Sequence, residues 1–146
     1  MKYNDVEILL VEDSMDDATL TIRALKKGGY NHKLHHVKDG AEALAFMYGQ
    51  DTYASREIRK HPKVIFLDLK MPKVTGIEVL EKLKSDPAFK SIPIIMLTSS
   101  KEDPDIKKCY ELGANSYIVK PVESENFSQT IKELGLYWMT RNHLSE

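Results

Sequence analysis

The chain has 146 residues, 42% of them hydrophobic and 29% charged, which is typical of one globular domain with a sizeable core. Its 21 basic and 22 acidic side chains give a formal net charge of −1, so the composition does not indicate binding to nucleic acid or to an anionic membrane. Cys109 is the single cysteine, which excludes an internal disulfide and favours a reducing, cytoplasmic location. The N-terminal apolar run at 8–11 is too short for a signal peptide or a membrane span. We therefore expect one domain over residues 1–146, with its core between about 6 and 138.

The first strand and the first helix are predicted near the N-terminus. Residues 7–11 form an apolar strand candidate, and a helix with one apolar face follows from Ser14, its expected N-cap, to the glycines at 28–29. We attribute Asp16 and Asp17 to the first helical turn, where the helix dipole favours negative charge. The apolar face of this helix is expected to contain Ala18, Ile22 and Leu25.

A second strand is predicted at 33–37, near a sheet edge because it carries histidines. His35 and His36 should point to opposite faces of the sheet, so we do not expect them to form a metal site. A short helix is predicted after the turn at 39–40. The polar segment at 49–63 has no clear period and is predicted to be an ordered or partly helical surface insertion, with a solvated loop favoured over a partner contact.

The strand that organises the rest of the chain is predicted at 64–67 and runs directly into Asp68. Its continuous apolar character, bounded by prolines, is typical of a strand buried on both faces of a parallel sheet. In such sheets ligands bind outside the carboxyl ends of the strands, which is where Asp68 stands.

Strands and helices continue to alternate to the end of the chain, which predicts an α/β fold with a parallel sheet of about five strands. The remaining elements are a helix from Gly76, a buried strand at 92–97, a weakly apolar helix at 102–112, a strand at 116–119 and a helix from Ser124. The apolar face of the last helix is predicted to contain Phe127, Ile131, Leu134 and Trp138.

Polar side chains follow four of the predicted strands and should meet at one edge of the sheet. Glu12 and Asp13 end the first strand, Asp68 the third, Thr98 the fourth and Lys120 the fifth. Three carboxylates at close range repel each other unless a cation lies among them, and hard oxygen ligands suit Mg²⁺. A lysine and a hydroxyl beside that ion would bind an anionic phosphoryl group. The combination predicts phosphoryl transfer to Asp68.

These residues resemble the response-regulator receiver domains of two-component signalling, over almost the whole chain from residue 7 to 138. The motifs that carry the resemblance are Glu12 with Asp13, Asp68 with Met71, Pro72 and Gly76, Thr98 with Ser99, and Lys120 with Pro121. Glu12 replaces a second Asp, which is a common variant in the family. The resemblance implies a doubly wound, flavodoxin-like fold with strand order 2-1-3-4-5 and helices on both faces.

The resemblance also implies the roles of individual residues. Asp68 would accept a phosphoryl group from a phosphohistidine of a sensor kinase or phosphotransfer protein. Asp13 and Asp68 would bind Mg²⁺ directly, together with the backbone carbonyl of Lys70, and Glu12 would act through water. Such a protein is a signalling phosphoacceptor that catalyses only its own phosphorylation and dephosphorylation.

The same resemblance implies how the signal leaves the domain. Thr98 and Lys120 would hold the phosphoryl oxygens, the bond between Lys120 and Pro121 would be cis, and Tyr117 would be the aromatic switch. The helix after Thr98, the strand of Tyr117 and the last helix would form a face for a partner or a second copy of the chain. The insertion at 49–63 and the aromatic end of the last helix resemble stand-alone regulators paired with bacterial phytochromes. We accordingly expect no output domain and no DNA binding.

Three alternatives remain open at this point. A phosphatase with an aspartyl nucleophile usually has a second acid two residues after it, where this chain has Lys70. A cobalamin carrier of similar fold would need a histidine there, and a flavin carrier would need a phosphate-binding loop where Glu12 and Asp13 would repel the phosphate. The third alternative is a degenerate receiver that serves only as a binding module.

Overall fold

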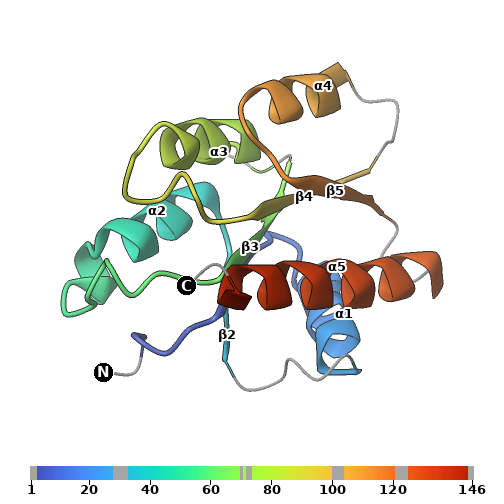
Figure 1. The fold of residues 1–146 in the computed structure, drawn as a ribbon, viewed down its shortest axis with the longest axis horizontal. Helices are drawn as coiled ribbons and strands as arrows, with labels where there is room; N and C mark the ends of the chain where they lie inside the picture. Colours follow the sequence, from blue (N-terminus) through green and yellow to red (C-terminus); the bar gives the residue numbers. More distant parts are fainter. Residues whose placement is uncertain are drawn as a thin grey trace.

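Five parallel strands form the centre of the computed structural model, which describes residues 3–27, 33–69, 71, 74–99, 104–120 and 125–144 (Figure 1). The strands are β1 (Ile8–Val11), β2 (Leu34–Val37), β3 (Val64–Asp68), β4 (Ile94–Thr98) and β5 (Ser116–Val119). Their order in the sheet is β2-β1-β3-β4-β5, and every neighbouring pair is parallel. The predicted fold class, strand order and edge position of β2 are therefore confirmed.

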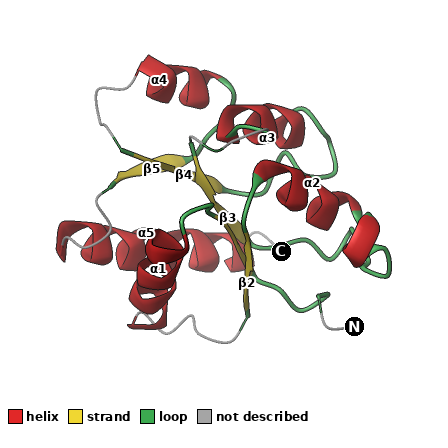
Figure 2. Ribbon diagram, turned by 180° about the vertical axis from the view of Figure 1, so that it is seen from behind, coloured by secondary structure: helices red, strands yellow, loops and turns green. Residues whose placement is uncertain are grey.

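Helices cover both faces of this sheet. The helices are α1 (Met15–Lys27), α2 (Gly40–Tyr48), α3 (Gly76–Lys84), α4 (Pro104–Glu111) and α5 (Glu125–Leu144), with a short 3₁₀ helix, η1 (Asp51–Tyr53), after α2. Helices α1 and α5 lie together on one side of the sheet, and α2 and α3 lie on the other, as Figures 1 and 2 both show. None of the helices within the described ranges combines the length and apolar character needed to cross a membrane.

The central strands are apolar throughout because each contributes to two cores. Leu9 and Val11 of β1 pack on the side of α2 and α3, whereas Ile8 and Leu10 pack on the side of α1 and α5. All four side chains are at most 2% exposed. This burial on both faces explains why the strand sequences show no alternation of apolar and polar residues. This burial also determines on which face, and at which edge of the sheet, the last residue of each strand lies.

The close packing of α3 against the end of β3 depends on Gly76. A Cβ atom at this position would collide with the carbonyl oxygen of Asp68 and would lie 2.9 Å from the Cα of Leu69. The backbone N–H of Gly76 instead donates to the Leu69 carbonyl at 3.1 Å. Thr75 and Glu78 cap the helix reciprocally, so α3 begins at a defined point beside Asp68.

The segment at 49–63 is mainly exposed, as predicted, and two of its side chains are buried against α2. It contains η1, as the partly helical prediction required, but Tyr53 and Arg56 are only 4% and 6% exposed. Arg56 donates from Nε to the Phe46 carbonyl at 2.7 Å and from a terminal nitrogen to the Met47 carbonyl at 3.1 Å. These carbonyls lie in the last turn of α2, where the regular helical donors are missing and only the capping N–H of Gly49 also reaches the Phe46 carbonyl. Tyr53 and Arg56 therefore anchor an otherwise mainly exposed segment to α2, a contact that hydrophobic periodicity could not reveal.

The other sequence predictions about the helices hold with small differences. Ser14 caps α1, since its Oγ accepts from the backbone N–H of Asp17 at 3.2 Å. Ile22 and Leu134 are half-buried rather than fully buried, and the side chain of Trp138 lies outside what the structure describes. The remaining predicted face residues of α1 and α5 are buried, namely Ala18, Leu25, Phe127 and Ile131.

Candidate functional site

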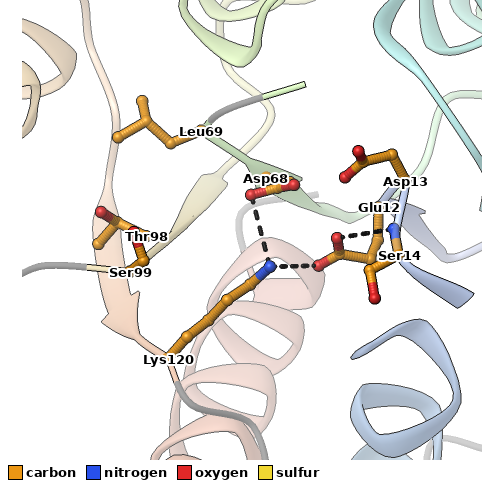
Figure 3. Close-up of a pocket in the computed structure, with 8 residues that line it drawn as sticks. All are labelled: Glu12, Asp13, Ser14, Asp68, Leu69, Thr98, Ser99 and Lys120. Atoms are coloured by element: carbon orange, nitrogen blue, oxygen red, sulfur yellow. Dashed lines mark hydrogen bonds and ion pairs between the residues drawn. The ribbon is translucent and has the colours of Figure 1, made fainter. Parts of the chain in front are cut away.

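The three predicted carboxylates meet at the carboxyl edge of the sheet (Figure 3). Glu12 follows β1 and is completely buried, Asp13 is exposed beside it, and Asp68 ends β3 with 6% exposure. One oxygen from each of these three side chains lies within 4.8 Å of the others. Neighbouring strands place them there because β1 and β3 are paired in parallel and end at the same level.

Lys120 brings a positive charge into this acidic group from the end of β5. Its Nζ lies 3.0 Å from Glu12 Oε1 and 3.6 Å from Asp68 Oδ1. The backbone N–H of Lys120 donates to the Thr98 carbonyl at 2.7 Å, which joins the ends of β4 and β5. Thr98 itself is 2% exposed. The predicted site residues Glu12, Asp13, Asp68, Thr98 and Lys120 therefore line one cavity, of about 180 Å³.

Asp17 is a member of this charge network that the sequence analysis did not identify. Its Oδ2 lies 2.9 Å from Lys120 Nζ, the shortest of the three ion pairs made by that ammonium. The interpretation of Asp17 as only a favourable charge at a helix N-terminus is therefore wrong. A usable signal was present, because Asp17 lies one helical turn after Asp13 and therefore near the strand end.

The balance of charge in the cavity favours a protonated Asp68. Burial, followed by the charge of Glu12, raises the pKa of the Asp68 carboxyl to about 8, against the opposing effect of Lys120. Burial alone would lower the pKa of Lys120, but its hydrogen bond to Asp17 and the charges of Asp68 and Glu12 raise it overall. A single ammonium is therefore too little positive charge for the acids around it.

The oxygens in the cavity fit a divalent cation. Glu12 Oε1 is buried and accepts no hydrogen bond, although it forms an ion pair with Lys120, and Glu12 Oε2 accepts from the backbone N–H of Ser14 at 3.2 Å. Within the described residues, Glu12, Asp13 and Asp68 are the only three ligand-type side chains that converge in this way. Carboxylate oxygens of this kind suit hard cations. The histidines at 35 and 36 have other contacts: the first meets the Tyr53 hydroxyl, and the second meets the Glu12 carbonyl.

Comparison with known proteins decides the family. The model of the response regulator receiver domain matches residues 8–132. The chain belongs to this family. Receiver domains are the signalling parts of two-component systems, and histidine kinases phosphorylate them. The chain is therefore a phosphoacceptor receiver, as the strand-end residues predicted.

Three relatives illustrate the similarity of this receiver to proteins of known structure. The response regulator Rcp1 of Synechocystis is 36% identical over 90% of this chain and 88% of its own length. Its Mn²⁺-bound structure has a TM-score of 0.79, with 90% of this chain and 93% of that chain covered. The phosphorylated cyanobacterial phytochrome response regulator RcpA is 36% identical with a TM-score of 0.81, over 92% and 94% of the two chains. The bacteriophytochrome response regulator RtBRR is 42% identical with a TM-score of 0.77, over 92% and 88%.

A second, narrow apolar cavity lies behind Thr98 in the receiver. Its lining residues are Leu69, Met96, Thr98, Ile106, Cys109, Tyr110, Ala114, Ser116 and Tyr117. Tyr117 is half-buried, and its ring packs edge-on against that of Tyr110 with centroids 5.9 Å apart. The two predicted switch residues, Thr98 and Tyr117, therefore border the same space.

Two predicted features of the site lie outside the described residues. The backbone carbonyl of Lys70 was predicted as a metal ligand, and the bond to Pro121 was predicted to be cis. Both remain predictions.

Proposed function

We propose that Asp68 is the residue of this receiver that accepts the phosphoryl group. The observation that carries the proposal is the position of its buried carboxylate at the end of β3, with Glu12 and Asp13 on one side and Lys120 on the other. Thr98 lines the same cavity and offers a hydroxyl. Asp68 is thus surrounded by the groups that an incoming phosphoryl group needs for charge neutralisation.

In the proposed reaction an oxygen of the Asp68 carboxylate attacks the phosphorus of a phosphohistidine. A P–O bond forms while the P–N bond breaks, and the imidazole leaves with the electrons of that bond and takes up a proton. Lys120 and the Thr98 hydroxyl would donate hydrogen bonds to the phosphoryl oxygens. Asp68 must be ionised to attack, and its raised pKa opposes this in the metal-free protein.

The metal of the reaction is proposed to be Mg²⁺. Asp13 and Asp68 would bind it directly, with the Lys70 carbonyl, and Glu12 would contribute through water. A bound Mg²⁺ would neutralise carboxylate and phosphoryl charge in this cavity. The buried Glu12 carboxylate supports this assignment, since the ammonium that it contacts, Lys120, is shared with Asp17 and Asp68.

The proposed donor is a sensor histidine kinase or phosphotransfer protein of the phytochrome type, in the cytoplasm. The similarity to RcpA and RtBRR, both named as phytochrome response regulators, supports this partner. The protein would be a signalling phosphoacceptor rather than an enzyme with other substrates, and the balanced charge of the chain gives no support to nucleic-acid binding.

The proposed output face consists of α4, β5 and α5. Movement of Thr98 toward the phosphoryl group would open the narrow space behind it, and rotation of Tyr117 into that space would relay the phosphorylation to this face. On this face Tyr110 and Tyr137 are 45% and 51% exposed. Exposed tyrosines often anchor protein interfaces, so a partner or a second copy of the chain would bind here. Sedimentation of the phosphorylated and unmodified protein tests the second copy, since a monomer in both states leaves only a different protein as partner.

Intact-mass measurement tests the assignment of Asp68. Wild type incubated with Mg²⁺ and acetyl phosphate, a small acyl phosphate donor, should gain the mass of one phosphoryl group, and excess EDTA should prevent the gain. Asp68→Asn should gain none. Asp16→Asn is the matched control, because it removes an exposed acid near the cavity that does not line it. A full gain in Asp68→Asn would overturn the assignment.

A further inference from the structure

The ammonium of Lys120 is held most closely by Asp17, a residue outside the acidic group that fits a cation. The Lys120 Nζ lies 2.9 Å from Asp17 Oδ2 but 3.6 Å from Asp68 Oδ1. The Asp17 side chain is 27% exposed, and that of Lys120 is 15% exposed, so the pair is partly shielded from solvent. The backbone N–H of Asp17 donates to Ser14 Oγ, which fixes the turn of α1 that carries this carboxylate.

The position of Asp17 matters because the other two partners of Lys120 serve the cation as well. Glu12 and Asp68 both belong to the group of acids that can reach one ion, and Asp17 does not. A divalent cation among these acids compensates their charge and repels a nearby ammonium. Lys120 has three ion-pair partners, Glu12, Asp17 and Asp68. Asp17 is the one of these three whose charge is not shared with the cation.

We propose that Asp17 is a positioning residue for Lys120. It keeps the ammonium in the cavity when the acidic group holds a cation, so that Lys120 is in place before the phosphoryl group arrives. An ammonium has three N–H donors, so Lys120 can donate to Asp17 and retain donors for phosphoryl oxygens. The inference rests on the proposed phosphorylation of Asp68, and it assigns to Asp17 a part in the rate of that reaction.

Asp16 provides the comparison that separates this role from the helix dipole. Asp16 and Asp17 are neighbours in the first turn of α1, where both carboxylates favour the helix. Asp16 is exposed, and Lys120 pairs with Asp17 and not with Asp16 within the described part of the chain. A role limited to the helix dipole would make Asp16→Asn and Asp17→Asn equivalent.

The test measures the initial rate of phosphorylation by acetyl phosphate at saturating Mg²⁺. Asp17→Asn should be slower than wild type by about tenfold, the size expected for loss of one charge-assisted hydrogen bond. Asp16→Asn should keep the wild-type rate, and Asp17→Glu, which retains the charge, should recover much of the loss. Equal rates for Asp16→Asn and Asp17→Asn would overturn the proposal.

A double-mutant cycle with Lys120→Met identifies Lys120 as the group through which Asp17 acts. In the Lys120→Met background the further change Asp17→Asn should have no effect on the rate, because the ammonium that Asp17 positions is absent. A further tenfold loss in that background would contradict the proposal.

Urea unfolding in EDTA provides a readout apart from phosphorylation: Asp17→Asn should destabilise the protein more than Asp16→Asn, and Lys120→Met should remove that difference. Persistence of the difference would also contradict it.

The experiment distinguishes failure of this inference from failure of the proposed function. If wild type gains no phosphoryl group, or Asp68→Asn gains one, the assignment of Asp68 fails. If wild type is phosphorylated on Asp68 and Asp17→Asn is as fast as Asp16→Asn, the proposed function stands and the role of Asp17 is overturned.

Discussion

Two lysines at opposite ends of the sheet show how differently this fold treats the same side chain. Lys120, at the carboxyl ends of the strands, contacts three carboxylates, and their combined effect raises its pKa. Lys84 ends α3 near the other edge of the sheet, where its Nζ donates to the Lys90 and Ile92 carbonyls and to Asn115 Oδ1 at 3.1, 2.8 and 3.1 Å. Burial lowers the pKa of Lys84 to about 8, since the three acceptors that it contacts are uncharged.

This difference separates a site whose charge state can change, around Lys120, from a structural contact, that of Lys84, which holds neighbouring segments together. At the Lys84 end, each donor of the ammonium has an acceptor, and the lysine joins α3 to the segments that precede β4 and β5. At the Lys120 end, one ammonium is shared among three carboxylates and the pKa of Asp68 is raised to about 8, so the acids there repel each other. A cation or a phosphoryl group can change the charge balance around Lys120, whereas the hydrogen bonds of Lys84 have no comparable ligand.

The largest expected effect is on phosphorylation, and it should distinguish the two lysines completely. Lys120→Met should slow phosphorylation by acetyl phosphate about 100-fold, the usual cost of removing one donor that stabilises developing charge. Lys84→Met should leave the rate unchanged because its ammonium lies away from the cavity. Rates from intact-mass time courses at saturating Mg²⁺ check both variants. Similar losses in both would show that the two lysines do not differ in this way.

The second effect is on the stability of the metal-free protein. A carboxyl whose pKa is raised on folding takes up protons that the unfolded chain releases, so stability falls as pH increases from about 4 to about 8. Asp68→Asn should abolish this fall and stabilise the EDTA-treated protein by about 2 kcal/mol at pH 8. Added Mg²⁺ should stabilise wild type and have little effect on Asp68→Asn. Urea unfolding at several pH values provides the measurement, and an identical pH dependence in the two proteins would contradict the prediction.

The contrast between the two ends also explains which parts of the site the sequence could predict. Each strand ends at a residue defined by its apolar run, so the sequence alone assigns Asp68, Thr98 and Lys120 to one edge of the sheet. The role of Asp17 depends on the reach of the Lys120 side chain across 103 positions of sequence. The spacing of one helical turn from Asp13 placed Asp17 near the strand end, but no local pattern encodes its distance to Lys120, and the helix dipole offered a sufficient local explanation.

The contact of Arg56 with α2 was not predicted for a similar reason. Arg56 is buried because its guanidinium satisfies backbone carbonyls at the end of α2, and a charged residue in a polar segment gives no sign of this in the sequence. The fold as a whole was predictable because burial on both faces of the sheet leaves a strong signal in every central strand. Contacts between polar side chains and distant backbone atoms leave none.

A smaller effect, on the free energy of unfolding, is expected from removing the hydrogen bonds of Lys84. Lys84→Met should destabilise the protein by about 1.5 kcal/mol, because the Lys90 and Ile92 carbonyls would lose their donor. Asn115 Oδ1 would keep its bond from the backbone N–H of Ile94, which limits the loss. Urea unfolding at pH 7 measures this change. Lys82→Met is the control, since Lys82 is exposed on the same helix, and an equal loss there would show that the contacts of Lys84 contribute nothing.

The smallest effect is the pH dependence that Lys84 gives to the free energy of unfolding, which should be opposite in sign to that of Asp68. A lysine whose pKa falls to about 8 on folding binds fewer protons than the unfolded chain between about pH 8 and its ordinary value, so stability should increase with pH over this window. The three oxygen acceptors favour the charged form and oppose the shift, so we expect at most about 1 kcal/mol between pH 8 and 9.5. The window stays below pH 10 because the raised pKa values of Tyr48 and Tyr53 reduce stability where unfolded tyrosines ionise.

The difference in unfolding free energy between wild type and Lys84→Met isolates this contribution, since the other groups titrate in both proteins. That difference should grow with pH, and a constant or shrinking difference would show that burial does not lower the pKa of Lys84.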